Sequence, residues 1–202
     1  MKIFKTRPAI SVFFLSLLLL SPLAQAYAET WQADFKIRVL SPKVKPIFYA
    51  GKLAVHHLKA RIETGESKEI NLYNFETLSE VRIFPEDQIY FKKPLSLAKQ
   101  VKAAKQGWGP MPASFHEKSV LLRKGQFKGR AARLYFVTIH RGNQTAYLMR
   151  WMSDEAAPLP LRAIYTSSGR ETIIVDFDPS REAPPAPDAF DPPKDYLSLN
   201  PF

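Results

Sequence analysis

The 202-residue sequence contains no cysteine. Disulfide bonds, a thiolate nucleophile and cysteine metal sites are therefore excluded. Catalytic signatures are also missing, since no G-x-S-x-G elbow, H-E-x-x-H pair or phosphate-binding loop occurs. His56 and His57 are neighbours in a predicted strand and should point to opposite faces, while His116 and His140 lack an obvious acidic partner. We therefore predict no catalytic residue, no metal site, no cofactor and no enzymatic activity. A hydrolase site assembled from distant strands is the less favoured alternative.

The longest hydrophobic run covers residues 10–20. Three basic residues precede it, and small residues follow it after Pro22. This arrangement is typical of a secretory signal peptide over residues 1–28, with cleavage after Ala26 or Ala28. The run is too short to favour a membrane-spanning helix. Because neither cleavage site is followed by cysteine, we expect no bacterial lipid anchor at the mature N-terminus.

Acidic residues are few in the middle of the chain. The net charge of +10 falls to +7 on export, because residues 1–28 hold three positive charges and no acid. Between Lys92 and Arg133, 11 lysines and arginines accompany a single acid, Glu117. Export argues against nucleic acid as the partner of this basic segment. The basic segment either forms a solvated surface without a partner, or it binds an anionic membrane or an acidic envelope polymer. The residues predicted to contact such a membrane are Lys92, Lys93, Lys99, Lys102 and Lys105.

Apolar residues alternate with polar ones along most of the chain, with a period of two. In residues 31–39 every odd position is apolar and every even position is polar, which indicates a strand that covers a core with one face. The same reasoning predicts strands over residues 47–55, 58–63, 68–73, 77–84, 89–91, 119–124, 131–140, 145–152, 159–166 and 171–177. The Gly142-Asn143 pair favours a tight hairpin between two of them. The sequence therefore predicts a mainly β protein.

One segment has the chemistry of a helix. Ser96 can cap its start, Gly107 can end it, and Leu97, Val101 and Ala104 share one face. A helix this short must dock on something to be stable in water. It is either a crossover helix packed on the sheet, a lid, or a basic helix that lies on a membrane.

The last part of the chain is rich in proline, which prevents regular strand pairing. We therefore expect three segments: the signal peptide at 1–28, one β domain at 29–178 and a C-terminal segment at 179–202. Phe190, Tyr196 and Leu199 are the predicted anchors that dock this segment on the domain. A disordered tail is the alternative.

The strands beside the Gly142 hairpin have apolar residues on both faces. Leu134 and Phe136 lie on one face of a strand whose other face carries Tyr135 and Val137. Both faces must then be covered, yet a chain with one short helix has little to cover a second face with. The helix, the proline-rich tail, a partner protein or an apolar ligand could do so. We therefore predict an apolar cavity within a curved sheet, or a cavity that the chain itself fills.

Several short motifs occur in an order that resembles bacterial periplasmic proteins with the lipoprotein-carrier (LolA/LolB-like) fold. The motifs are YAGKLAV at 49–55, LKARIE at 58–63, VRIFP at 81–85, QIYF at 88–91, YLMRWMS at 147–153, PLR at 160–162 and FDPPKDY at 190–196. Dedicated carriers open with a long helix, whereas here a strand begins near Trp31, and their lid arginine has no evident counterpart. The resemblance is therefore to the broader, uncharacterised group of carrier-like envelope proteins.

This resemblance implies a curved antiparallel half-barrel with one or two short helices against its concave side, located in the periplasm. The carriers hold lipoprotein acyl chains in the cavity of that fold, although a fold alone does not determine function. We therefore predict a non-enzymatic binding protein for an acyl chain, lipid or similar apolar ligand, or else an interaction or sensor module that contacts another envelope protein. The predicted ligand-binding residues are Phe35, Ile37, Tyr135, Val137, Tyr147, Met149 and Trp151.

Overall fold

The computed structural model of the chain describes residues 30–42, 44–65, 68–156, 158–166, 171–180 and 183–199. The predicted signal peptide lies outside the described residues. Within them, no helix is long and apolar enough to span a bilayer.

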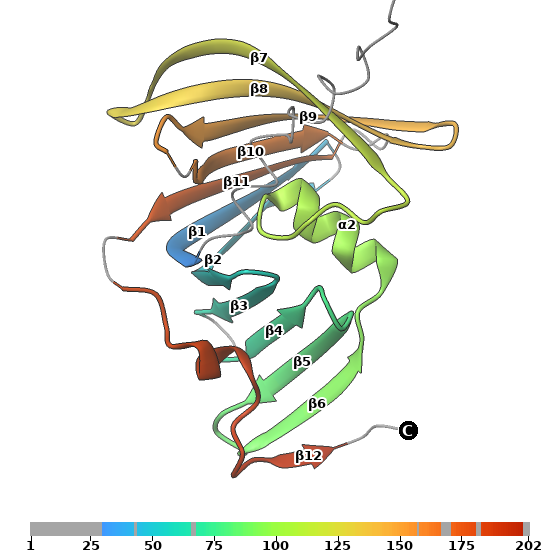
Figure 1. Cartoon of the computed structure of the whole chain (residues 1–202), viewed down its shortest axis with the longest axis vertical. Coiled ribbons are helices and arrows are strands. Elements are labelled where there is room, and N and C mark those ends of the chain that lie inside the picture. The colour runs from blue at the N-terminus through green and yellow to red at the C-terminus, as the bar shows by residue number, and fades with distance from the viewer. Residues whose placement is uncertain are drawn as a thin grey trace, which may run out of the picture.

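Twelve strands form a single open sheet that curves around one α-helix (Figure 1). The helix is α2 (Leu97–Gln106), and the strand order across the sheet is β12-β6-β5-β4-β3-β2-β1-β11-β10-β9-β8-β7. The predicted mainly β half-barrel is therefore confirmed. The strands are β1 (Thr30–Ser41), β2 (Val44–His56), β3 (Lys59–Thr64), β4 (Ile70–Asn74), β5 (Ser79–Phe84), β6 (Ile89–Pro94), β7 (His116–Phe127), β8 (Arg130–Arg141), β9 (Gln144–Ser153), β10 (Pro160–Thr166), β11 (Thr172–Pro179) and β12 (Leu197–Leu199).

Local chemistry accounts for the ends of α2. The Ser96 side chain accepts a hydrogen bond from the backbone N–H of Lys99 at 3.4 Å, as an N-cap does. Gly107 ends the helix in the left-handed region with φ of 88°, which glycine adopts without steric cost. The helix lies on the concave face of the sheet, and Ala103 is fully buried there. We call this face the inner face and the opposite one the outer face.

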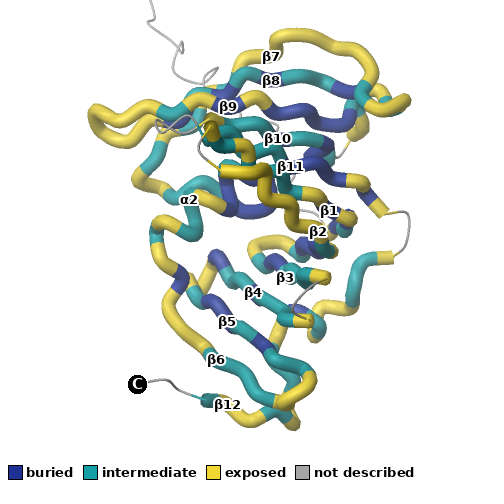
Figure 2. The backbone as a smooth tube through the Cα atoms, turned by 180° about the vertical axis from the view of Figure 1, so that it is seen from behind, coloured by how far each residue is buried: buried dark blue, intermediate teal, exposed yellow. Residues whose placement is uncertain are grey.

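The main core lies between the inner face and α2. Alternation along β1 places Trp31, Ala33 and Phe35 on this face, as the sequence predicts. Figure 2 shows the buried positions gathered in the central strands and at α2, whereas β7 is mostly exposed. The buried side chains of this cluster are Trp31, Ala33, Phe35, Leu53, Val55, Ala60, Phe75, Leu95, Ala103, Trp108, Ala163, Val175 and Phe177.

The C-terminal segment contacts the outer face of β3 to β6. It contains a 3₁₀-helix, η1 (Pro187–Phe190), whose Phe190 ring lies 5.6 Å from the His56 ring. Arg61 Nη1 donates to the Ala189 carbonyl at 2.8 Å. Tyr196 packs with the buried cluster of β4 and β5, and β12 then pairs in parallel with β6. These contacts cover a part of the outer face that α2 cannot reach.

Candidate ligand-binding site

A cavity of about 390 Å³ lies between the inner face and one side of α2. Strands β1 to β4 and β11 form its wall, and α2 with the turn after it forms its roof. Cavities that bind small molecules typically measure about 300–1,000 Å³. The lining residues are Phe35, Ile37, Tyr49, Leu53, Ile62, Thr64, Asn71, Tyr73, Lys99, Lys102, Gln106, Trp108, Val175 and Phe177.

The wall is apolar because strand alternation and register bring side chains of one parity together. Ile37 faces Tyr49 across β1 and β2, and Leu53 faces Ile62 across β2 and β3. Opposite Phe35 stands Gly51, where a Cβ atom would lie 2.1 Å from the Glu63 carbonyl oxygen. Glycine is therefore required at this crowded point, and it lets the Phe35 ring lie against β2.

Lysines supply the charge at the roof. Lys99 Nζ donates to Glu80 Oε2 at 2.6 Å, and Lys93 Nζ lies 3.8 Å from the same carboxylate. The Glu80 side chain is fully buried, so its charge is held by these two lysines. The side chain of Lys102, one turn further along α2, forms no hydrogen bond or ion pair with the residues that the structure describes. The roof thus combines a neutralised lysine with an uncompensated one.

The remaining polar groups at the cavity are uncharged. Trp108 Nε1 donates to Gln106 Oε1 at 3.1 Å, which satisfies a buried indole N–H. Burial raises the pKa of the Tyr73 hydroxyl to about 12, and the nearby Glu80 charge contributes in the same direction. Tyr73 is therefore neutral under physiological conditions. The cavity wall carries no negative charge of its own among the lining residues that the structure describes.

A buried arginine of β9 fixes the roof to the sheet. Arg150 Nη2 donates to the Ala104 carbonyl of α2 at 2.9 Å, and its Nη1 lies 3.4 Å from Glu117 Oε1 of β7. Its side chain is only 1% exposed. The hydrogen bond to this carbonyl is strengthened by the charge of the guanidinium. Because Ala104 lies in the second half of α2, the positive charge also interacts favourably with the helix dipole. Arg150 therefore links α2 directly to β9 and β7.

Solved structures share this architecture, whereas the sequence matches no protein-family model and no curated protein. An uncharacterised conserved protein from Thermus thermophilus has a TM-score of 0.55 and 9% identity, over 90% of this chain and 96% of that one. A LolA superfamily protein from Nitrosomonas europaea has a TM-score of 0.50 and 15% identity, over 88% of this chain and 98% of that one. The fold is LolA-like. At these identities the likeness concerns the fold alone.

The LolA-like sheet does not bring the seven predicted ligand-binding residues together. Phe35 and Ile37 line the cavity. Tyr135 and Val137 lie on the inner face but in a separate buried cluster further along the sheet, with Ile139, Leu148 and Met152. The other three, Tyr147, Met149 and Trp151, lie on the outer face of β9.

Other lining residues escaped the sequence analysis. Tyr49 and Ile62 belong to predicted strands, and their place on the wall follows from strand register once the sheet order is known. Trp108 lies in the turn that follows α2, and the structure places this turn at the cavity. Lys102 was grouped with the other lysines by charge, and only the orientation of α2 separates it from them.

The five lysines of the predicted membrane-binding surface do not share one surface. Lys92 and Lys93 are neighbours in β6 and lie on opposite faces. Lys99 and Lys102 line the cavity, whereas the Lys105 Nζ lies over the Tyr165 ring, 5.6 Å from its centroid.

The histidine prediction needs a correction. His57 lies in the β2–β3 turn with φ of 52°, and its ring centroid is 4.5 Å from that of His56. The two rings therefore lie together and not on opposite faces, because the strand ends at His56. No group of three or more metal-binding side chains occurs among the residues that the structure describes.

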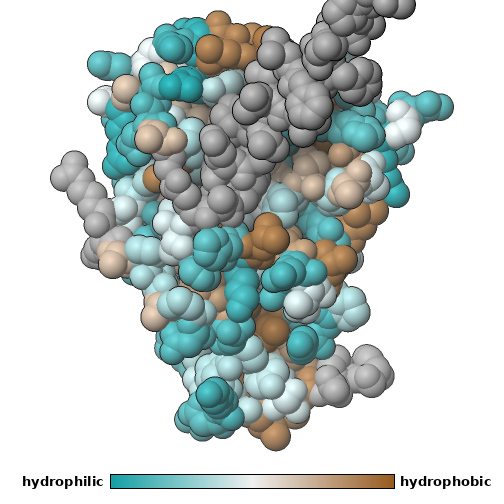
Figure 3. Space-filling model, viewed as in Figure 1, coloured by the Kyte–Doolittle hydropathy of each residue, from teal (hydrophilic) through white to brown (hydrophobic). Residues whose placement is uncertain are grey.

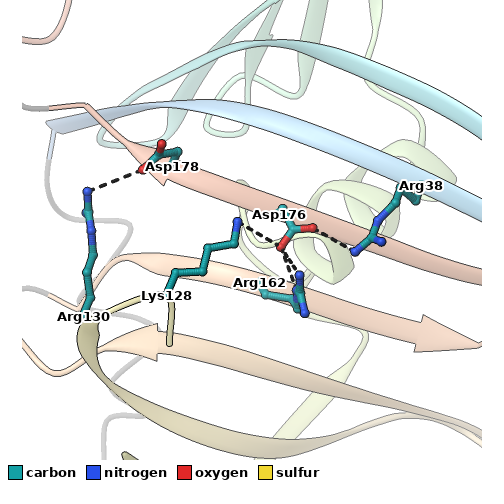
Figure 4. Close-up of polar contacts among 6 residues, drawn as sticks. All are labelled: Arg38, Lys128, Arg130, Arg162, Asp176 and Asp178. Carbon is teal, nitrogen blue, oxygen red and sulfur yellow. Dashed lines mark hydrogen bonds and ion pairs between the residues drawn. The ribbon is translucent and has the colours of Figure 1, made fainter. Parts of the chain in front are cut away.

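The outer face of the LolA-like sheet carries cations beside exposed apolar side chains. Asp176 accepts from Arg162 and Arg38 at 2.7 and 3.2 Å and lies 3.6 Å from Lys128 Nζ, while Arg130 pairs with Asp178 (Figure 4). Next to this cluster, cross-strand neighbours form an apolar row over five strands. The row consists of Val120, Phe136, Met149, Ile164 and Ile174. Figure 3 shows hydrophobic side chains at the surface over β7, at the top of the view.

Proposed function

We propose that this chain is a non-enzymatic binding protein of the cell envelope that holds an acyl chain or similar apolar group in the cavity beneath α2. The observation that carries the proposal is a mostly apolar cavity of about 390 Å³ whose wall and roof come from separate elements. The LolA-like fold supports it, because that fold leaves an inner face which a short helix only partly covers. The sequence features at residues 1–28 support export, and a periplasmic location follows from the resemblance.

Burial of apolar surface would supply the binding energy. Each methylene group removed from water contributes about 0.8 kcal/mol before the costs of association. Ile37 and Ile62 are only partly buried, so a ligand would cover surface that the chain leaves open. The expected ligand is therefore long and apolar rather than compact and polar.

Native mass spectrometry of protein isolated from the periplasm without detergent tests this function. We expect a co-purifying lipid-like mass that is lost on denaturation. The variant Ile62→Trp should reduce its occupancy, because the indole fills space in the cavity. Met149→Trp is the matched control, since Met149 lies 40% exposed on the outer face. The proposal would be contradicted if the protein carried no co-purifying ligand and also failed to bind added fatty acids in a titration.

The outer face supports a second candidate function, docking at an anionic membrane surface. Its apolar row lies beside Arg38, Arg123 and Arg162, and the cations near Asp176 outnumber the acids. Apolar side chains beside basic ones suit the interface of a bilayer that contains acidic lipids.

Vesicle co-sedimentation tests this docking. We expect binding to vesicles with phosphatidylglycerol, weaker binding to pure phosphatidylcholine, and loss of binding as salt is added. Val120→Glu should weaken binding, whereas Leu78→Glu should not, because Leu78 is equally exposed at 47% but lies in the β4–β5 turn. Equal binding to both kinds of vesicle, or none, would remove this candidate.

A further inference from the structure

The size of the cavity limits how many chains it can hold. Because a dry cavity of about 150 Å³ holds one benzene molecule of about six carbons, a cavity of 390 Å³ has room for about 15 carbon atoms. That corresponds to one acyl chain. Two or three chains, as in a diacyl lipid or a triacylated lipoprotein, would require about two to three times this volume.

The charge at the roof indicates what kind of head group that chain carries. Within the described residues no aspartate or glutamate lines the cavity, and both charged lining residues are lysines of α2. Lys99 is already paired with buried Glu80, and Lys93 shares that carboxylate. Glu63, which lies between two lining residues of β3, pairs with Arg61, and Glu69, just before β4, pairs with Arg82.

Lys102 remains as the cation with no acid to neutralise it within the described part of the chain. Its side chain is attached to an exposed position of α2 yet borders an apolar wall. A lysine in that place can keep its ammonium group in water while its stem lies along the wall. An anion at the end of a bound chain would meet this ammonium group at the mouth of the cavity.

We infer that the cavity takes a single-chain amphiphile with an anionic head group, the chain lying along Ile37 and Ile62 and the head group bound by the ammonium group of Lys102. This inference rests on the proposed function and narrows it to one ligand class. A carboxylate and a phosphate share the required chemistry. A positively charged head group would be repelled by the ammonium group of Lys102.

Isothermal titration calorimetry with one chain length and several head groups tests the inference. The probes are dodecanoate, dodecyl phosphate, dodecyl maltoside and dodecyltrimethylammonium, each below its micelle concentration. We expect both anions to bind at least about tenfold more tightly than the maltoside, which corresponds to about 1.4 kcal/mol, and the cation to bind most weakly. The ratio of the two anions distinguishes a carboxylate from a phosphate ligand.

The variant Lys102→Met should remove the preference for anions, so that both anions bind no more tightly than the maltoside. Lys105→Met is the matched control, because it makes the same change on the same helix at a side chain that lies over Tyr165 instead of lining the cavity. A variant that fails to fold would be recognised by its circular dichroism spectrum. In that case Lys102→Gln replaces it in the same comparison.

A second comparison tests the number of chains. A lysophosphatidic acid should bind more tightly than the diacyl phosphatidic acid with the same head group. Equal binding of all four dodecyl probes, or tighter binding of the diacyl lipid, would overturn the inference and leave the proposed function standing. If none of the probes binds, both fail.

Discussion

Replacing Arg150 with methionine should loosen the roof of the cavity. The change removes the 2.9 Å bond to the Ala104 carbonyl and leaves Glu117 without its partner. Breaking a buried ion pair on one side costs about 3–5 kcal/mol, and a charge-assisted hydrogen bond alone is worth about 1.5–3 kcal/mol. Because the Glu117 side chain is 16% exposed and water can reach it, we expect the lower end of the range, about 3 kcal/mol.

Urea denaturation of Arg150→Met measures this loss through the midpoint at constant slope. For a chain of this size the melting temperature should fall by about 6–12 °C. Hydrogen exchange should accelerate in the amides of α2 more than in those of β3 and β4. Adding Glu117→Gln to the variant should recover part of the lost free energy of unfolding, because it removes the unpaired charge of Glu117.

Arg123→Met is the control for this prediction. The Arg123 guanidinium lies 5.1 Å from the Trp151 ring on the outer face and holds no helix, so its loss should cost less than about 1 kcal/mol. If Arg150→Met were no more destabilising than Arg123→Met, or if exchange in α2 were unchanged, Arg150 would not fix the roof.

Two further predictions concern the cavity wall. Gly51→Ala should destabilise the fold by about 2 kcal/mol in urea denaturation, since its Cβ would lie 2.1 Å from the Glu63 carbonyl oxygen, whereas Gly125→Ala meets nothing within 4 Å and should be neutral. Equal effects would contradict this. Because burial and Glu80 raise the pKa of Tyr73 from 10.0 to about 12, its contribution is fully present below about pH 10 and is lost as the pH rises through about 12. Stability measured over that window should fall less steeply in Tyr73→Phe, and identical slopes would refute the assignment.

Most of the secondary structure follows from the sequence because apolar residues alternate with a period of two. The Ser96 cap and the Gly107 terminus predicted α2 closely, since both are local signals. The short β12 was not predicted, because its pairing with β6 depends on where a proline-rich segment happens to run. Non-local pairing of this kind leaves no pattern within the segment itself.

Which face of a strand points inward could be predicted for β1 but not for β8 and β9. Gln32 and Lys36 mark the outer face of β1, whereas β8 and β9 carry apolar side chains on both faces. Arg150 lies on the buried inner face of β9, while Tyr147 on the other face is 56% exposed. Hydrophobicity alone therefore could not select the inward face of either strand. The orientation depends on α2, whose bond to Arg150 is invisible in the sequence.

The parallel pairing of β12 with β6 has a consequence for self-association. An unpaired edge strand offers its backbone groups to strands of other molecules. At β6 the short strand Leu197–Leu199 occupies that position, while the far edge at β7 is interrupted by an irregularity between Leu121 and Arg123 and carries basic side chains. Removing the residues from Leu197 onward would therefore leave β6 as an unpaired edge strand. The shortened protein should form oligomers through β6 before it loses its fold.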